Sequence, residues 1–188
     1  MDPLRIPDRA ALPDSDEALM EQFCEGNAAA FDTLFSRHAP AVRGYLARLV
    51  GSTASADDLT QTAFLSLVRA RGRFLKGSRF KPWLYAIATN AARDSRRRGK
   101  HEALTDSGDL PQQAGEEMRL ADPGLEKQVH LALKQLPDNQ REAILQHRLH
   151  GLSFAEIAAV EGVTESAVKV RAHRGYERLR VLLKGLWP

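Results

Sequence analysis

Residues 153–180, the most informative part of the chain, read SFAEIAAVEGVTESAVKVRAHRGYERLR. Ser153 and Glu156 have the three-residue spacing of a capping box, which marks the start of a helix. Gly162 permits a sharp turn into a second helix, and Val163 has the size to fill the junction between the two helices. This pattern predicts a helix-turn-helix.

The second helix of this motif carries a polar and basic outer face. Its outward positions follow a helical spacing, and three arginines flank them: Ser166, Lys169, Val170 and His173, with Arg171, Arg174 and Arg178. One row can reach base edges in a major groove while the arginines bind phosphates. We therefore predict a duplex-binding surface, and the alternative is a helical hairpin whose basic face is only solvated.

A second basic helix is predicted upstream, within FKPWLYAIATNAARDSRRR of residues 80–98. Aromatic residues at its start are followed by a polar face made of Thr89, Asn90, Arg93 and Arg97. Stacking surfaces beside phosphate-binding cations suit unstacked, single-stranded nucleic acid. Trp83 and Tyr85, taken singly, are more often core residues than stacking platforms.

The composition is that of a globular protein with a substantial core, since 43% of the 188 residues are hydrophobic and 27% are charged. No apolar run approaches the roughly 20 residues of a membrane span, and no secretory signal is evident, so we expect a cytoplasmic protein. Cys24 is the only cysteine, which excludes a disulfide framework. His147 and His150 lack a third metal ligand, and no nucleotide-binding motif occurs, so we expect no metal, no cofactor and no catalysis.

Apolar residues recur at helical spacing and no strand-like alternation persists, which predicts an all-α fold. We expect two small helical domains, residues 14–99 and 125–185, joined by a flexible acidic linker over residues 100–124. Residues 69–100 carry eleven basic residues against one acidic, and the chain is basic again after Val163. Two basic blocks separated by an acidic spacer suggest two surfaces for a polyanion.

Caps and helix breakers predict where the helices of the first domain begin. Asn27 is expected to start the second helix. The third is expected to begin near Ala56, which would put Asp57 in its first turn. Residues 72–82 are expected to form a basic loop, with a helix from Trp83 onward.

Three segments, taken together, resemble a known family: DDLTQTAFLSLVRA of residues 57–70, the segment of residues 80–98, and residues 133–180. In this order they are similar to the minimal two-domain extracytoplasmic-function sigma factors of bacteria. The resemblance covers the chain from about Ala18 to Leu183. It implies that the two domains are regions two and four of a sigma factor, which directs RNA polymerase to promoters with two elements.

The resemblance also implies three sets of site residues. The acidic helix would bind the β′ clamp helices of core RNA polymerase through Asp57, Asp58, Leu59, Gln61, Thr62, Phe64 and Leu65. Region two would recognise the minus-ten element, and its loop from Phe74 to Phe80 would capture a flipped base. The residues implied for this element are Phe74, Lys76, Arg79, Phe80, Trp83, Asn90, Arg93, Asp94 and Arg97. Region four would read the minus-thirty-five element through Ser166, Lys169, Arg171, His173, Arg174 and Arg178.

The partners implied by the resemblance are core RNA polymerase, including its β flap, and promoter DNA in duplex and single-stranded form. A further implied partner is an anti-sigma factor, which could hold the protein at a membrane. The alternative is a helix-turn-helix regulator that acts without core polymerase. Such a regulator would have no use for the acidic helix of residues 57–70.

Overall fold

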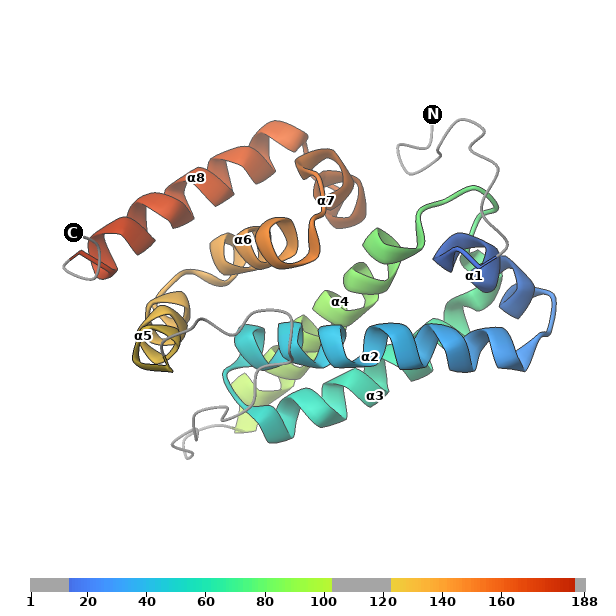
Figure 1. The fold of residues 1–188 in the computed structure, drawn as a ribbon. Coiled ribbons are helices and arrows are strands. Elements are labelled where there is room, and N and C mark those ends of the chain that lie inside the picture. Colours follow the sequence, from blue (N-terminus) through green and yellow to red (C-terminus); the bar gives the residue numbers. More distant parts are fainter. Residues whose placement is uncertain (1–13, 103–122, 185–188) are drawn as a thin grey trace.

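The structure, a computed structural model, describes residues 14–102 and 123–184, and every regular element within them is helical (Figure 1). The elements are α1 (Asp16–Cys24), α2 (Ala28–Val50), α3 (Thr53–Ala70), the 3₁₀ turn η1 (Arg71–Arg73), α4 (Phe80–Glu102), α5 (Pro123–Lys134), α6 (Asp138–His150), α7 (Phe154–Glu161) and α8 (Glu165–Leu182). The all-α prediction is confirmed. The predicted acidic linker falls mostly on residues 103–122, outside the described residues. None of the described helices combines the length and apolarity that a membrane span requires.

Helices α1 to α4 form the first region, and polar side chains cap the starts of its first two helices. The Ser15 hydroxyl accepts a hydrogen bond from the amide of Ala18 at 3.2 Å. The side chain of Asn27 accepts one from the amide of Ala29 at 3.1 Å. Each cap satisfies an amide that has no partner inside its helix, which is why these residues start helices here.

Helix α3 begins earlier than the sequence predicts, at Thr53 instead of near Ala56. The cause is Ser52, whose hydroxyl accepts a hydrogen bond from the amide of Ser55 at 3.3 Å. Asp57 therefore lies beyond the first turn, where the helix dipole contributes little to its stability.

Helix α4 also begins earlier, at Phe80 instead of Trp83. The amide of Phe80 donates to the Glu17 carboxylate of α1 at 3.2 Å, so α1 supplies the cap that the local sequence lacks. Pro82 fits this start because no amide in the first turn of a helix has an intrahelical partner. The predicted loop is consequently shorter.

Helices α5 to α8 form the second region and contain the predicted helix-turn-helix. The hydroxyl of Ser153 accepts from the amide of Glu156 at 3.2 Å, and the Glu156 carboxylate accepts in return from the amide of Ser153 at 2.8 Å, which completes the capping box. Gly162 ends α7 with a φ of 66°, a conformation that favours glycine. Val168 and Ala172 are buried on the inner side of α8, as predicted.

The two regions pack directly against each other, with α6 beside α2 and α7 beside α4 (Figure 1). Gln146 of α6 is fully buried, and its amide donates to the Thr89 hydroxyl of α4 at 3.3 Å. The ring of His150 stacks on Tyr85 of α4, with 3.9 Å between ring centroids. Tyr45 of α2 meets the same histidine edge-on. The core is therefore continuous across the two regions.

Leu34 of α2 is fully buried in this core, whereas Leu131 of α5 is 42% exposed. Truncating a buried leucine removes its contacts and leaves a cavity. We expect Leu34→Ala to lower the free energy of unfolding by about 2–5 kcal/mol, measured by denaturant titration followed by circular dichroism. The matched control, Leu131→Ala, should lower it by less than about 1 kcal/mol. Equal losses in the two variants would contradict this core.

Candidate nucleic-acid interface

The polar face of α4 presents Asn90 and Arg97 to solvent, as expected for a surface that binds nucleic acid. Arg97 forms an ion pair with Asp94 one turn earlier. Arg93, between them, is only partly exposed, because side chains of the second region cover it. The predicted residues of this helix thus share one face, but only part of that face is open.

The loop before α4 is held by α1. The amide of Gly77 donates to the Glu21 carboxylate at 3.2 Å, and Gly77 adopts a φ of 79°, which favours glycine. Lys76 and Arg79 project from this loop with substantial exposure. A loop held in place by such contacts can present its exposed cations to a phosphate backbone at a lower ordering cost.

The aromatic residues predicted to contact DNA lie deeper than expected. Phe80 is fully buried and Phe74 nearly so, while Trp83 packs edge-on against Phe74 with 5.2 Å between ring centroids. A ring that forms part of the core cannot stack on a base without leaving it. Burying these rings in the core under the loop is more favourable than exposing them to solvent. Only the exposed residues predicted for the minus-ten element are therefore available to contact DNA.

Helix α8 presents the outer face that the sequence predicts. Its exposed predicted residues are Ser166, Lys169, His173, Arg174 and Arg178. Val170 is exposed among them, although an apolar side chain usually avoids solvent. Arg171 is the exception, since it turns toward α7 and forms an ion pair with Glu161 at 2.7 Å.

The outer face of α3 carries the residues predicted to bind polymerase. The exposed members are Asp57, Asp58, Gln61, Thr62 and Leu65. The side chain of Asp57 accepts hydrogen bonds from Arg43 of α2, which lowers the pKa of that carboxyl. Leu59 and Phe64 are buried, so they support this surface from within instead of contacting a partner.

An exposed aromatic residue that packs against α3 was not predicted from the sequence. Phe35 of α2 has the spacing of a core residue, yet 40% of it is exposed, and its ring meets Phe64 at 4.8 Å. Leu65 of α3 is 57% exposed. An apolar centre with carboxylates along the same helix is the composition of a protein-binding patch. Helical periodicity indicates which residues share a face, but not how far that face extends beyond the core.

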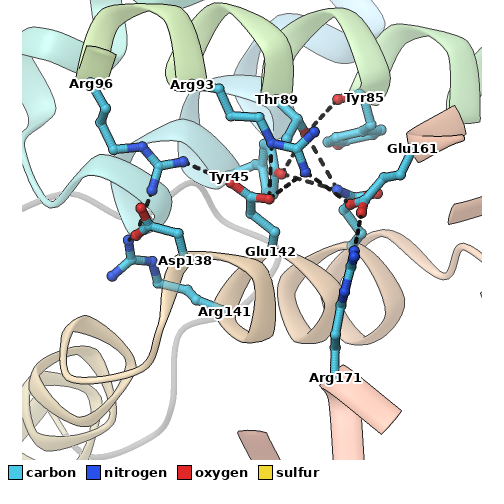
Figure 2. A network of polar contacts seen from close by, with 11 residues as sticks. Tyr45, Tyr85, Thr89, Arg93, Arg96, Asp138, Arg141, Glu142, Glu161 and Arg171 are labelled. Carbon is cyan, nitrogen blue, oxygen red and sulfur yellow. Dashed lines mark hydrogen bonds and ion pairs between the residues drawn. The ribbon is translucent and has the colours of Figure 1, made fainter. Parts of the chain in front are cut away.

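Arginines of α4 bind carboxylates of the second region (Figure 2). Arg93 lies 2.6 Å from Glu142 and 3.2 Å from Glu161. Arg96 binds the other oxygen of Glu142 at 2.7 Å and also pairs with Asp138 at 2.6 Å. The Glu142 side chain is only 2% exposed, so its charge is compensated almost entirely by these two arginines.

Glu161 joins both predicted DNA-binding helices. One oxygen faces Arg93 of α4 and the other faces Arg171 of α8 (Figure 2). Burial raises the pKa of Glu161 despite these two cations. Burial alone would lower the pKa of Arg93, but the hydrogen bonds to Glu142 and the negative charges of Glu142 and Glu161 together outweigh it, and the pKa is raised. Sequence reasoning assigned no role to Glu142 or Glu161, because each lies in a different helix from its partners.

A helix-turn-helix together with a second helix rich in arginine is typical of a helical DNA-binding transcription factor. Comparisons with known proteins show which family of transcription factors this is. Residues 34–102 match the family described as Sigma-70 region 2, and residues 126–179 match Sigma-70, region 4. The RNA polymerase sigma factor CarQ of Myxococcus xanthus is 47% identical over 165 residues, which cover 87% of this chain and 95% of that protein. The ECF RNA polymerase sigma factor SigM of Mycobacterium tuberculosis is 36% identical over 90% of this chain and 85% of that protein.

Two solved structures are also similar. CnrH, in complex with the cytosolic domain of CnrY, matches with a TM-score of 0.70 and 28% identity over 89% of this chain and 96% of that one. The sigma factor RpoE, in complex with the anti-sigma factor NepR from Bartonella quintana, matches with a TM-score of 0.72 and 26% identity over 82% of this chain and 97% of that one. The chain belongs to the extracytoplasmic-function (ECF) RNA polymerase sigma factors. This family consists of transcription initiation factors and not of enzymes.

The buried histidine between the regions predicts a pH dependence. Burial, together with the nearby charges of Lys81 and Arg48, lowers the pKa of His150 from 6.5 to about 3. Between these values the unfolded chain binds a proton that the folded chain does not, so stability is retained above about pH 6.5 and falls as the pH falls. At pH 5 the loss from this group should be about 2 kcal/mol relative to pH 7.

The measurement compares denaturant unfolding at pH 7 and pH 5 for the natural protein and for His150→Phe. Phenylalanine keeps a ring against Tyr85 but cannot titrate. The variant should therefore lose about 2 kcal/mol less on acidification, while carboxylates and the other histidines titrate equally in both proteins. The same loss in both proteins would contradict a buried, neutral His150.

Proposed function

We propose that this sigma factor binds core RNA polymerase through the outer face of α3 and directs it to promoters with two elements. The exposed residues Asp58, Gln61 and Leu65 would form the docking patch for the β′ clamp helices, and Phe35, exposed on α2 and packed against Phe64 of α3, would extend it. The observation that carries the proposal is the presence of both family regions, each with exposed charged residues at the positions that the resemblance assigns. In this proposal residues 14–99 and 125–185 are the two functional domains, and residues 100–124 connect them.

The first domain would recognise the minus-ten element. Lys76 and Arg79 on the loop, with Asn90 and Arg97 on α4, are exposed and can contact phosphates and unstacked bases. Leu75 is 60% exposed at the same loop and offers an apolar contact for a base. Capture of a flipped base by this loop would let binding energy assist promoter melting without a separate energy source.

The second domain would read the minus-thirty-five element through α8. Lys169 and His173 lie on the outer face of α8, and Arg174 and Arg178 can bind phosphates. The β flap of polymerase would place this domain on upstream DNA. Loss of this helix face would weaken promoter selection without preventing assembly with polymerase.

An anti-sigma factor is the third partner that we propose. Both similar structures named above are complexes with a bound protein, and in one of them the sigma factor RpoE is bound to NepR, which is described as an anti-sigma factor. A partner of this kind would compete with polymerase for the patch on α3. Tethering of that partner to a membrane would place this chain at the membrane surface.

Reversing one charge on α3 tests the docking patch. Asp58→Lys leaves the pair between Arg43 and Asp57 intact. It should weaken association with bacterial core RNA polymerase by about tenfold or more, because a positive charge would replace a carboxylate in the proposed docking patch. Affinity is measured by titrating labelled protein with core enzyme. The control Glu25→Lys makes the same charge change on another exposed residue and should leave affinity nearly unchanged. A protein that binds duplex DNA but never binds core enzyme would instead support a regulator that acts without polymerase.

Removing one cation from α8 tests the upstream contact. Lys169→Ala should weaken binding of the holoenzyme to duplex promoter DNA and should reduce the salt slope of log affinity by about one. The promoter is obtained first by sequencing transcripts initiated in vitro. Lys127→Ala on α5 is the control with the same change of charge, and its salt slope should stay that of the natural protein. Equal slopes for the two variants would remove Lys169 from the proposed interface.

A further inference from the structure

One exposed apolar side chain lies among the polar residues of α8. Val170 is 45% exposed in the second turn of this helix, and the exposed residues Ser166 and His173 lie one turn before and one turn after it. Residues 161–180 are all described, and among them no other large apolar side chain is exposed. The other exposed valine of α8, Val181, belongs to its last turn.

The position of Val170 gives its exposure a meaning that a single surface valine does not have by itself. In a helix-turn-helix, the first turns of the second helix enter the major groove and contact base edges. Helix α8 is that second helix, and the exposed cations Lys169 and Arg174 flank Val170 on either side of the helix face. With phosphates bound on both sides, the side chain between the two cations faces the base edges.

The two cations next to Val170 in sequence do not cover it. The ammonium of Lys169 lies 2.7 Å from the Glu165 carboxylate, one turn earlier. The guanidinium of Arg171 lies 2.7 Å from the Glu161 carboxylate of α7. Both long side chains are thus engaged with acids, and the methyl groups of Val170 remain open to a partner.

The side chains one turn before Val170 are short. A helical side chain leans back over the preceding turn, which here presents Ser166 and Ala167. Valine also has a single strongly preferred rotamer in a helix. Its two methyl groups are therefore held at a fixed place on the outer face, and contact with a base costs little side-chain entropy.

Thymine is the base that offers an apolar group in the major groove. Its C5 methyl lies beside the O4 acceptor, whereas purines present only hydrogen-bonding groups there. A valine pressed against a purine edge would remove donors or acceptors from water without a hydrogen bond in return, which is costly. Ser166 and His173, one turn away on either side, carry groups that can donate to an acceptor such as O4.

We propose that Val170 is a specificity-determining residue, which recognises one thymine of the minus-thirty-five element through the C5 methyl of that base. This inference rests on the proposed function of α8. The cations of α8 bind phosphates whatever the sequence, so they position the helix without selecting this base. Val170 supplies the selection by packing its methyl groups against that of thymine.

The test uses the full chain assembled with bacterial core RNA polymerase and a promoter duplex identified from transcripts initiated in vitro. Each thymine of the minus-thirty-five element, on either strand, is replaced in turn by deoxyuridine, which lacks only the C5 methyl. Holoenzyme affinity is measured by competition with a fluorescently labelled promoter, in the cold so that the promoter stays duplex. The variant is Val170→Ala, and the control Val181→Ala removes the same atoms from the other exposed valine of α8.

In the natural holoenzyme, deoxyuridine at one position should weaken binding by about threefold to fivefold, the order expected for one buried methyl group. Val170→Ala should weaken binding to the unmodified promoter by at least about the same factor. At the sensitive position this variant should bind the thymine and deoxyuridine duplexes within about 1.5-fold, because alanine does not reach the methyl. Val181→Ala should keep the full sensitivity. A purely structural role of Val170 would not couple it to one methyl group in this way.

Three results would overturn the assignment: an element without thymine on either strand, an element in which no deoxyuridine weakens binding, or an equal deoxyuridine effect in the natural protein and in Val170→Ala. Weaker binding by Val170→Ala without any deoxyuridine effect would instead place Val170 against the sugar-phosphate backbone. Unchanged DNA affinity in Val170→Ala would remove the residue from the DNA interface and leave it to a protein partner.

The proposed function fails by different results. It fails if the natural protein does not bind core polymerase, or if its holoenzyme does not bind the promoter duplex. A holoenzyme that binds DNA through Lys169, yet does not respond to the thymine methyl, would keep the proposed function of α8 and lose only the role of Val170.

Discussion

A buried carboxylate must be met by cations, and this constraint organises the contact between the two halves of the chain. Glu142 lies on α6 with its side chain almost fully covered, and Arg93 and Arg96 of α4 reach it from the other region. Removing one partner from such a group leaves an uncompensated charge, which is costly. These ion pairs therefore tie α6 to α4, while α6 packs against α2 and α7 against α4. The stacking of His150 on Tyr85 adds apolar contact at the same junction.

Carboxylates also hold separate elements together inside the first region. Glu17 and Glu21 of α1 accept hydrogen bonds from backbone amides at the start of α4 and in the loop before it. Each bond satisfies an amide that would otherwise face the core or solvent alone. Helix α1 thereby shapes the loop whose exposed cations we assign to the minus-ten element. An acidic segment near the start of the chain thus supports a basic surface more than fifty residues away in sequence.

Much of the candidate site could be predicted from sequence where the signal is local. The capping box of Ser153 and Glu156 and the buried positions Val168 and Ala172 depend on residues within one or two turns of each other. The exposed face of α8 then follows from helical geometry. The roles of the aromatic residues near α4 were harder to predict, because an aromatic side chain such as that of Phe80 occurs both in cores and on stacking surfaces. Only the packing beneath the loop decides between the two.

The all-α class, the helix-turn-helix and the family could be predicted from the sequence, since these rest on periodicity, caps and contiguous motifs. Only the docking of the helices shows that Arg93 and Arg171 share Glu161, and that Phe35 stays exposed while its ring packs against Phe64. The physical reason is the separation along the chain of the residues that interact. A capping bond forms between neighbours along the chain and is encoded at fixed spacing, whereas an ion pair between α4, α7 and α8 depends on how separate helices dock, and no spacing in the sequence specifies that distance.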